Sequence, residues 1–146
     1  MSQPVPILLL EDSEIDIEIV KRTFKKSKID NPFYAVKDGV EALKILNGEG
    51  EDQISQPCVI LIDINMPRMD GLSFLEKVRD NEDLSKNVAF ILTTSSRPED
   101  MERAYRLNAA GYIIKDDIKH LGDMLGGYLN INRFPVEDTS FSPFSY

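Results

Sequence analysis

Five short apolar runs, separated by amphipathic stretches, constrain the fold of this 146-residue chain more than any other feature. The runs cover residues 7–10, 33–36, 58–62, 88–92 and 111–114. Uninterrupted apolar runs of this length are typical of strands that are covered on both faces. The alternation therefore predicts an α/β fold, with a doubly wound parallel sheet of five strands between two helical layers, joined by right-handed crossovers.

The amphipathic stretches predict the helices and their ends. Ser13 is a suitable N-cap for the first helix, with Asp16 three positions later, and Pro98 suits the start of the fourth. A last helix is expected over residues 118–129, weakened by the Gly126-Gly127 pair. We expect the buried stripe of the first helix to consist of Ile15, Ile19, Val20 and Phe24.

Composition excludes several classes of function. The net charge of −8 and the absence of a basic patch oppose binding to nucleic acid. No run approaches the ~20 apolar residues of a membrane span, and no secretion signal is visible. The single cysteine, Cys58, opens an apolar run and is interpreted as a small core residue rather than a reactive thiol. These features predict a cytoplasmic protein.

The chain is expected to form one domain over residues 1–130. Residues 131–146 contain two prolines and four aromatic residues without a period. This segment is interpreted as a flexible tail or as an arm that docks on a partner or on a second copy of the chain.

Polar and charged residues follow four of the five apolar runs. Glu11 and Asp12 follow the first, Asp63 the third and Lys115 the fifth, while Thr93 closes the fourth. In an open parallel sheet such residues meet at the carboxyl edge. Each alone could be a turn, cap or surface residue, but their joint placement at separate strand ends indicates a site.

The residue types in this set favour cation binding and phosphoryl transfer. Neighbouring carboxylates repel one another, and a hard divalent cation such as Mg²⁺ relieves that repulsion. A carboxylate beside such an ion can attack phosphorus and form an acyl phosphate. An ammonium group and a hydroxyl can then stabilise the transferred group.

Four segments resemble the receiver domains of two-component response regulators. They are Leu-Leu-Glu-Asp-Ser at 9–13, Asp-Ile-Asn-Met-Pro-Arg-Met-Asp-Gly at 63–71, Leu-Thr-Thr-Ser at 92–95 and Gly-Tyr-Ile-Ile-Lys at 111–115. The resemblance covers about residues 6–130 and implies a flavodoxin-like strand order, 2-1-3-4-5. The loop before the third strand and the Leu-Thr-Thr-Ser segment are similar to stand-alone regulators associated with bacterial phytochromes.

The resemblance implies a phosphoacceptor at Asp63. It also implies a site for Mg²⁺ (or Mn²⁺) formed by Glu11, Asp12, Asp63 and the backbone carbonyl of Asn65, with Asp12 as a direct ligand. Because Asn65 is expected to contribute its backbone carbonyl, its side chain matters less in this assignment.

The resemblance further implies a switch hydroxyl at Thr93, a phosphate-binding Lys115 and a switch aromatic at Tyr112. Thr93 is preferred to Thr94 because only Thr93 gives the family's usual interval to Lys115. Tyr112 could instead serve only strand packing. One departure is plain, since Asp116 stands where the family usually has a proline, and the preceding peptide is therefore expected to be trans.

The implied function is a bacterial phosphoprotein that accepts its phosphoryl group from a sensor histidine kinase, of the phytochrome type, and is not a turnover enzyme. Output is expected through protein contact, with homodimerisation through the face of the fourth helix, fifth strand and fifth helix. The sole histidine, His120, is interpreted as a surface residue.

Two other classes of function compete with this interpretation. A metal-dependent phosphohydrolase of similar topology typically has an Asp-x-Asp motif, whereas this chain has Asp63-Ile64-Asn65. A flavodoxin-like cofactor binder needs a hydroxyl- and glycine-rich phosphate loop after the first strand, where Glu11 and Asp12 would repel phosphate.

Overall fold

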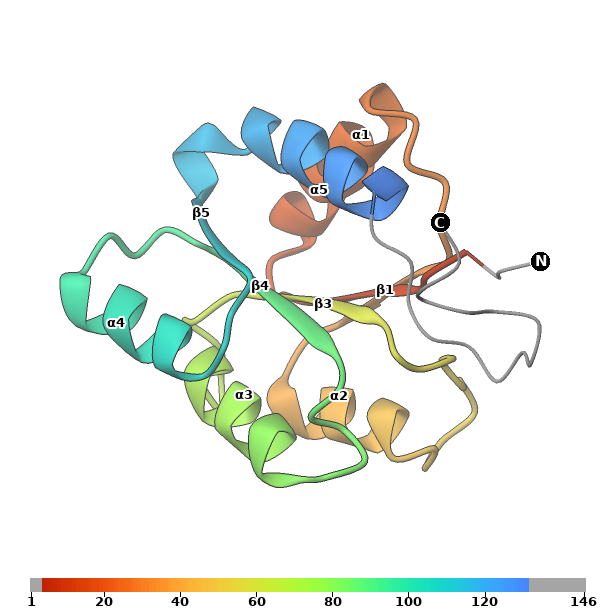
Figure 1. Ribbon diagram of the computed structural model, residues 1–146, viewed down its shortest axis with the longest axis vertical. Coiled ribbons are helices and arrows are strands. Elements are labelled where there is room, and N and C mark those ends of the chain that lie inside the picture. Colours follow the sequence, from red (N-terminus) through yellow and green to blue (C-terminus); the bar gives the residue numbers. More distant parts are fainter. Residues whose placement is uncertain (1–3, 132–146) are drawn as a thin grey trace.

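The computed structural model describes residues 4–131, in which strands and helices alternate (Figure 1). The elements are β1 (Ile7–Leu10), α1 (Glu14–Lys26), β2 (Phe33–Val36), α2 (Gly39–Leu46), β3 (Val59–Ile62), α3 (Gly71–Asp80), β4 (Val88–Thr93), α4 (Pro98–Arg106), β5 (Gly111–Ile114), a 3₁₀ helix (Lys115–Asp117) and α5 (Lys119–Ile131). Of the tail predicted at 131–146, Ile131 is the last residue of α5, and the rest lies outside the described residues.

The strands form one parallel sheet in the order β2-β1-β3-β4-β5, which confirms the predicted fold class and strand order. Leu10 of β1 is in register with Ile62 of β3. The amide of Asp63 donates to the carbonyl of Leu10 at 3.0 Å. The residues that follow β1 and β3 therefore emerge side by side, where the strand order reverses and sites in such sheets usually form.

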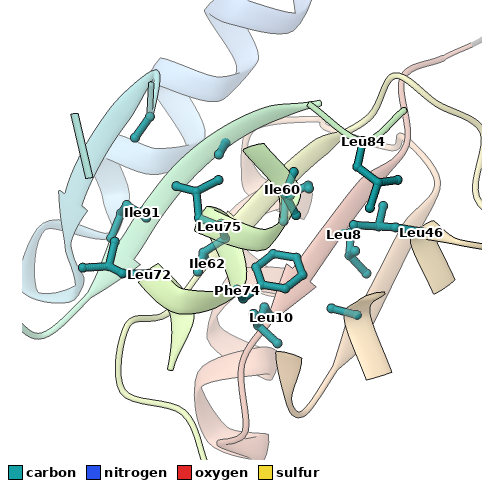
Figure 2. Packing of buried hydrophobic residues seen from close by; sticks show 14 of the residues in the cluster. Leu8, Leu10, Leu46, Ile60, Ile62, Leu72, Phe74, Leu75, Leu84 and Ile91 are labelled. Atoms are coloured by element: carbon teal, nitrogen blue, oxygen red, sulfur yellow. The ribbon is translucent and has the colours of Figure 1, made fainter. Parts of the chain in front are cut away.

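Helices cover both faces of the sheet, with α1 and α5 on one side and α2, α3 and α4 on the other (Figure 1). Alternate side chains of each strand enter one core or the other because successive residues of a strand point to opposite faces. Figure 2 shows Phe74 of α3 packed among strand residues on the second side. The largest buried side chains there are Leu8, Leu10, Ile60, Ile62, Leu72, Phe74, Leu75 and Ile91.

The predicted starts of the first and fourth helices are confirmed. The hydroxyl of Ser13 accepts a hydrogen bond from the amide of Asp16 at 3.2 Å and caps α1. Pro98 is the first residue of α4, where its missing N–H has no partner to lose. The last helix continues through the Gly126-Gly127 pair to Ile131.

The predicted buried stripe of α1 is partly wrong. Ile15 is 73% exposed and Ile19 is 37% exposed, whereas Ile17, Val20 and Phe24 are buried. At about 100° per residue, Ile17, Val20 and Phe24 share one side of the helix and Ile15 and Ile19 lie opposite. Only one of these stripes can face the sheet. The ring of Phe24 packs edge-on against the ring of Phe33, with 5.7 Å between the ring centroids, so the stripe with Phe24 is the buried one.

Cys58 is fully buried, as its position in an apolar run predicts. Burial raises the pKa of its thiol to about 12, so the reactive thiolate is suppressed. Among the helices within residues 4–131, none has the length and apolar character needed to cross a membrane.

Candidate functional site

Three carboxylates meet beyond the ends of β1 and β3. Glu11, Asp12 and Asp63 each place one oxygen within 4.8 Å of the others. Glu11 and Asp63 are only 1% and 5% exposed, while Asp12 faces the solvent. This grouping follows from the parallel register, which carries the backbone of Asp63 alongside that of Glu11.

The ammonium of Lys115, from the end of β5, reaches the same group of carboxylates. Its Nζ atom lies 2.5 Å from Glu11 Oε1, 3.0 Å from Asp63 Oδ2 and 2.7 Å from Asp16 Oδ2. A lysine ammonium has three N–H donors, so each can serve one of these carboxylates. The structure therefore brings together four of the predicted site residues and adds Asp16.

The electrostatics of the group favour a cation. Burial raises the pKa of Glu11 to about 7, and the negative charge of Asp63 adds to that effect, although the hydrogen bond from Lys115 opposes it. Burial also acts to lower the pKa of Lys115, but hydrogen bonds to Asp16, Glu11 and Asp63 outweigh it and raise that pKa. When all are ionised, the four carboxylates exceed the single ammonium by three negative charges.

The loop after β3 packs tightly against the backbone of Asp63. The amide of Asn65 donates to Asp63 Oδ1 at 3.2 Å, and the amide of Gly71 donates to the carbonyl of Ile64 at 2.9 Å. A Cβ atom on residue 71 would lie 2.1 Å from the carbonyl oxygen of Asp63. Glycine is therefore required there for α3 to begin so close to Asp63.

Arg68 links this loop to α2. It adopts a left-handed conformation, with φ of 64°, and its guanidinium forms an ion pair with the carboxylate of Asp38. Asp38 also accepts a hydrogen bond from the amide of Glu41 at 2.9 Å and caps α2. Burial acts to raise the pKa of Asp38, but the hydrogen bonds from Arg68 and Glu41 lower it overall. One carboxylate thus fixes both the loop and the helix.

Thr93 and Tyr112 both contact Ser95, a residue that sequence reasoning did not single out. Buried Thr93 accepts a hydrogen bond on Oγ1 from the amide of Ser95 at 3.3 Å. The hydroxyl of Tyr112 donates to the carbonyl of Ser95 at 2.9 Å. Ser95 Oγ in turn donates to Asp100 Oδ2 of α4 at 2.6 Å. Ser95 therefore connects both predicted switch residues to α4.

The segment after Lys115 forms a single 3₁₀ turn over Lys115–Asp117. Within residues 4–131 the one cis peptide bond is Gln56–Pro57, so the Lys115–Asp116 peptide is trans, as predicted. Asp116 and Asp117 are both exposed.

The sequence assigned Asp16 only to the cap of α1, and its contact with Lys115 was not predicted. The amide of Asp16 donates to Ser13 Oγ as expected, but its carboxylate accepts a hydrogen bond from Lys115. The amide of Ser13 donates to Glu11 Oε2 at 3.2 Å, so the side chain of Asp16 is not needed for that amide. Its place in the first helical turn after β1 was the available signal, since that turn lies at the same edge as the other carboxylates.

Comparison with known proteins identifies a family for most of the chain. Residues 7–125 match the family described as the response regulator receiver domain. This match spans all five strands and the first half of α5.

Individual relatives agree with that match. Response regulator Rcp1 from Synechocystis sp. is 36% identical over 126 residues, covering 85% of this chain and 86% of Rcp1. The Mn²⁺-bound crystal structure of Rcp1 is similar with a TM-score of 0.77 at 32% identity, covering 91% of this chain and all of that one. The crystal structure of the phosphorylated cyanobacterial phytochrome response regulator RcpA is similar with a TM-score of 0.79 at 28% identity. The similarity covers 92% of this chain and 100% of RcpA.

Proposed function

The chain belongs to the response regulator receiver domain family, and we propose that it accepts a phosphoryl group on Asp63 from a sensor histidine kinase. The observation that supports this proposal is the convergence of Glu11, Asp12, Asp63 and Lys115 at one edge of the sheet. Homology to phytochrome response regulators favours a kinase of the phytochrome type. Because such a kinase draws on ATP, the encounter is expected in the cytoplasm.

A divalent cation fits the donor set. Glu11, Asp12 and Asp63 offer hard oxygen ligands within one small volume, which suits Mg²⁺ or Mn²⁺, and the carbonyl of Asn65 is proposed to complete the protein ligands. The relative Rcp1 has been crystallised in a Mn²⁺-bound form. When bound, such a cation neutralises negative charge on the transferring phosphoryl group.

The side chains of the chain itself then have distinct tasks. A carboxylate oxygen of Asp63 attacks phosphorus, and an O–P bond forms as the P–N bond of the kinase phosphohistidine breaks. The imidazole leaves and takes a proton from solvent. Lys115 donates to one phosphoryl oxygen, and the hydroxyl of Thr93 donates to another, which stabilises the charge as it is transferred.

Signalling is proposed to result from the Thr93 hydroxyl moving toward the phosphoryl group. That movement breaks the hydrogen bond that Thr93 accepts from the amide of Ser95. Ser95 also accepts a hydrogen bond from Tyr112 on its carbonyl and donates one to Asp100 from its hydroxyl. The result is a shift between two populations of the α4–β5–α5 face. Tyr105, which is 53% exposed on α4, is a candidate contact on that face for a second copy of the chain or another protein.

The proposal is tested by incubating the chain with ³²P-labelled acetyl phosphate and Mg²⁺. We expect one acid-stable, hydroxylamine-labile label per chain, absent from Asp63→Asn and retained in Asp52→Asn, a matched change in an exposed loop. Label that persists in Asp63→Asn contradicts the assignment of the phosphoacceptor. Continuous turnover of many phosphate esters would instead favour the phosphohydrolase.

A further inference from the structure

Asp16 contacts the ammonium of Lys115 but lies outside the group of acidic oxygens formed by Glu11, Asp12 and Asp63. We propose that Asp16 is a positioning residue for phosphoryl transfer, which keeps Lys115 aimed at the site while its other N–H groups change partners and one of them passes to a phosphoryl oxygen. This inference rests on the proposed function of Asp63. It assigns Asp16 no direct contact with the phosphoryl group.

The three carboxylates that contact Lys115 are not equivalent. Glu11 and Asp63 belong to the group of acidic oxygens that suits a cation, and Asp63 loses its free carboxylate when it is phosphorylated. Asp16 stands outside that group and contacts Lys115 at 2.7 Å. It can therefore keep its hydrogen bond when the partners of the other two donors change.

Asp16 is itself firmly placed. Its amide donates to Ser13 Oγ, and the amide of Ser13 donates to Glu11 Oε2, so the first turn of α1 is tied to the end of β1. Its side chain is 32% exposed, while that of Lys115 is 13% exposed, which leaves the bond partly shielded from water. A charge-assisted hydrogen bond in such surroundings restricts the lysine more than an exposed ion pair would.

Lys115 needs such an anchor because the next residues in the chain do not hold it in place. Asp116 occupies the position where the resemblance leads one to expect a proline, and the turn continues with exposed Asp117. Neither residue restrains φ as a proline does. A carboxylate on α1 restrains the lysine from a different element of the fold.

The test measures phosphorylation of the full chain by acetyl phosphate in Mg²⁺. We expect Asp16→Ala to lower the maximal rate about tenfold with a smaller change in KM, and Asp16→Asn to recover part of the loss. Glu18→Gln, a change of charge on the exposed side of the same helix, should leave both constants unchanged. In a Lys115→Ala background, Asp16→Ala should cause no further loss, because it acts only through the lysine.

A second readout does not depend on activity. At low temperature, the ¹⁵N–¹H signal of the Lys115 ammonium should exchange with water faster in Asp16→Ala than in the wild-type chain, while the urea midpoint changes little. Equal maximal rates in wild type and Asp16→Ala, or an equally protected signal in that variant, overturn the inference. A wild-type chain that takes no label overturns the proposed function instead, so the two failures are distinct.

Discussion

The raised pKa of Glu11 predicts that cation binding depends on pH near neutrality. Burial raises this pKa to about 7 from an ordinary value of 4.5. A cation that binds Glu11 must first displace the proton, because a metal ligand has to be ionised. The affinity of the wild-type chain for Mg²⁺ should therefore rise with pH until Glu11 is fully ionised.

The size of the effect depends on the ionised fraction of Glu11. With a pKa near 7, that fraction rises from about 3% at pH 5.5 to about 76% at pH 7.5, which predicts a gain in affinity of about 25-fold. A carboxyl group with a pKa of 4.5 would give only about 1.1-fold over the same range. The two cases are easily separated by titration.

The assay is isothermal titration calorimetry with Mg²⁺ in two buffers of different ionisation enthalpy, which also counts the protons released. We expect close to one proton released at pH 6 and almost none at pH 8.5. Glu11→Gln should bind more weakly and with little dependence on pH, while Glu14→Gln, an exposed neighbour, should keep the wild-type profile. A flat profile in the wild-type chain would refute the reasoning.

The same shift has a consequence for stability without added cation. Because the folded pKa is above the unfolded one, the contribution of Glu11 to stability is full below pH 4.5 and is lost as pH rises through 7. For a shift of this size it amounts to about 3 kcal/mol. Urea denaturation in EDTA should show this loss in the wild-type chain and not in Glu11→Gln.

Three further predictions concern the framework of the site, and urea denaturation checks each. Gly71→Ala should lower the free energy of unfolding by about 3 kcal/mol, because the new Cβ collides with the Asp63 carbonyl; a neutral result would contradict the close approach. Asp70→Ala should cost about 1 kcal/mol, since its carboxylate caps α3 through the amide and hydroxyl of Ser73, and Asp70→Ser should restore most of that loss. Arg79→Met should lower the free energy of unfolding by about 2 kcal/mol, because the guanidinium donates to four backbone carbonyls. An unchanged urea midpoint would show that water replaces these hydrogen bonds.

The sequence alone was enough to predict the sheet and the composition of its carboxyl edge. The apolar runs fix which residues form strands, and parallel register then carries Glu11 and Asp63 to the same place whatever the details of the helices. The helix starts predicted from Ser13 and Pro98 were also confirmed, because the residues that begin a helix act on their near neighbours in the chain.

Contacts made across elements could not be predicted in the same way. Residues 15–24 carry two apolar stripes, and which one is buried depends on packing against partners such as Phe33, far along the chain. The contact of Asp16 with Lys115 spans 99 residues and depends on that same rotation of α1. The role of Ser95 lies partly in its backbone groups, which no residue type reveals.

The unequal exposure of the adjacent residues Glu11 and Asp12 gives the site a direction of approach. A divalent cation arriving with its hydration shell would meet solvent-facing Asp12 first and would shed water as it advanced toward buried Glu11. Asp12 is exposed in the part of the chain that the structure describes. Exchange of the ion should accordingly be governed by its own rate of dehydration, and occupancy should follow the free concentration in the surrounding medium without delay.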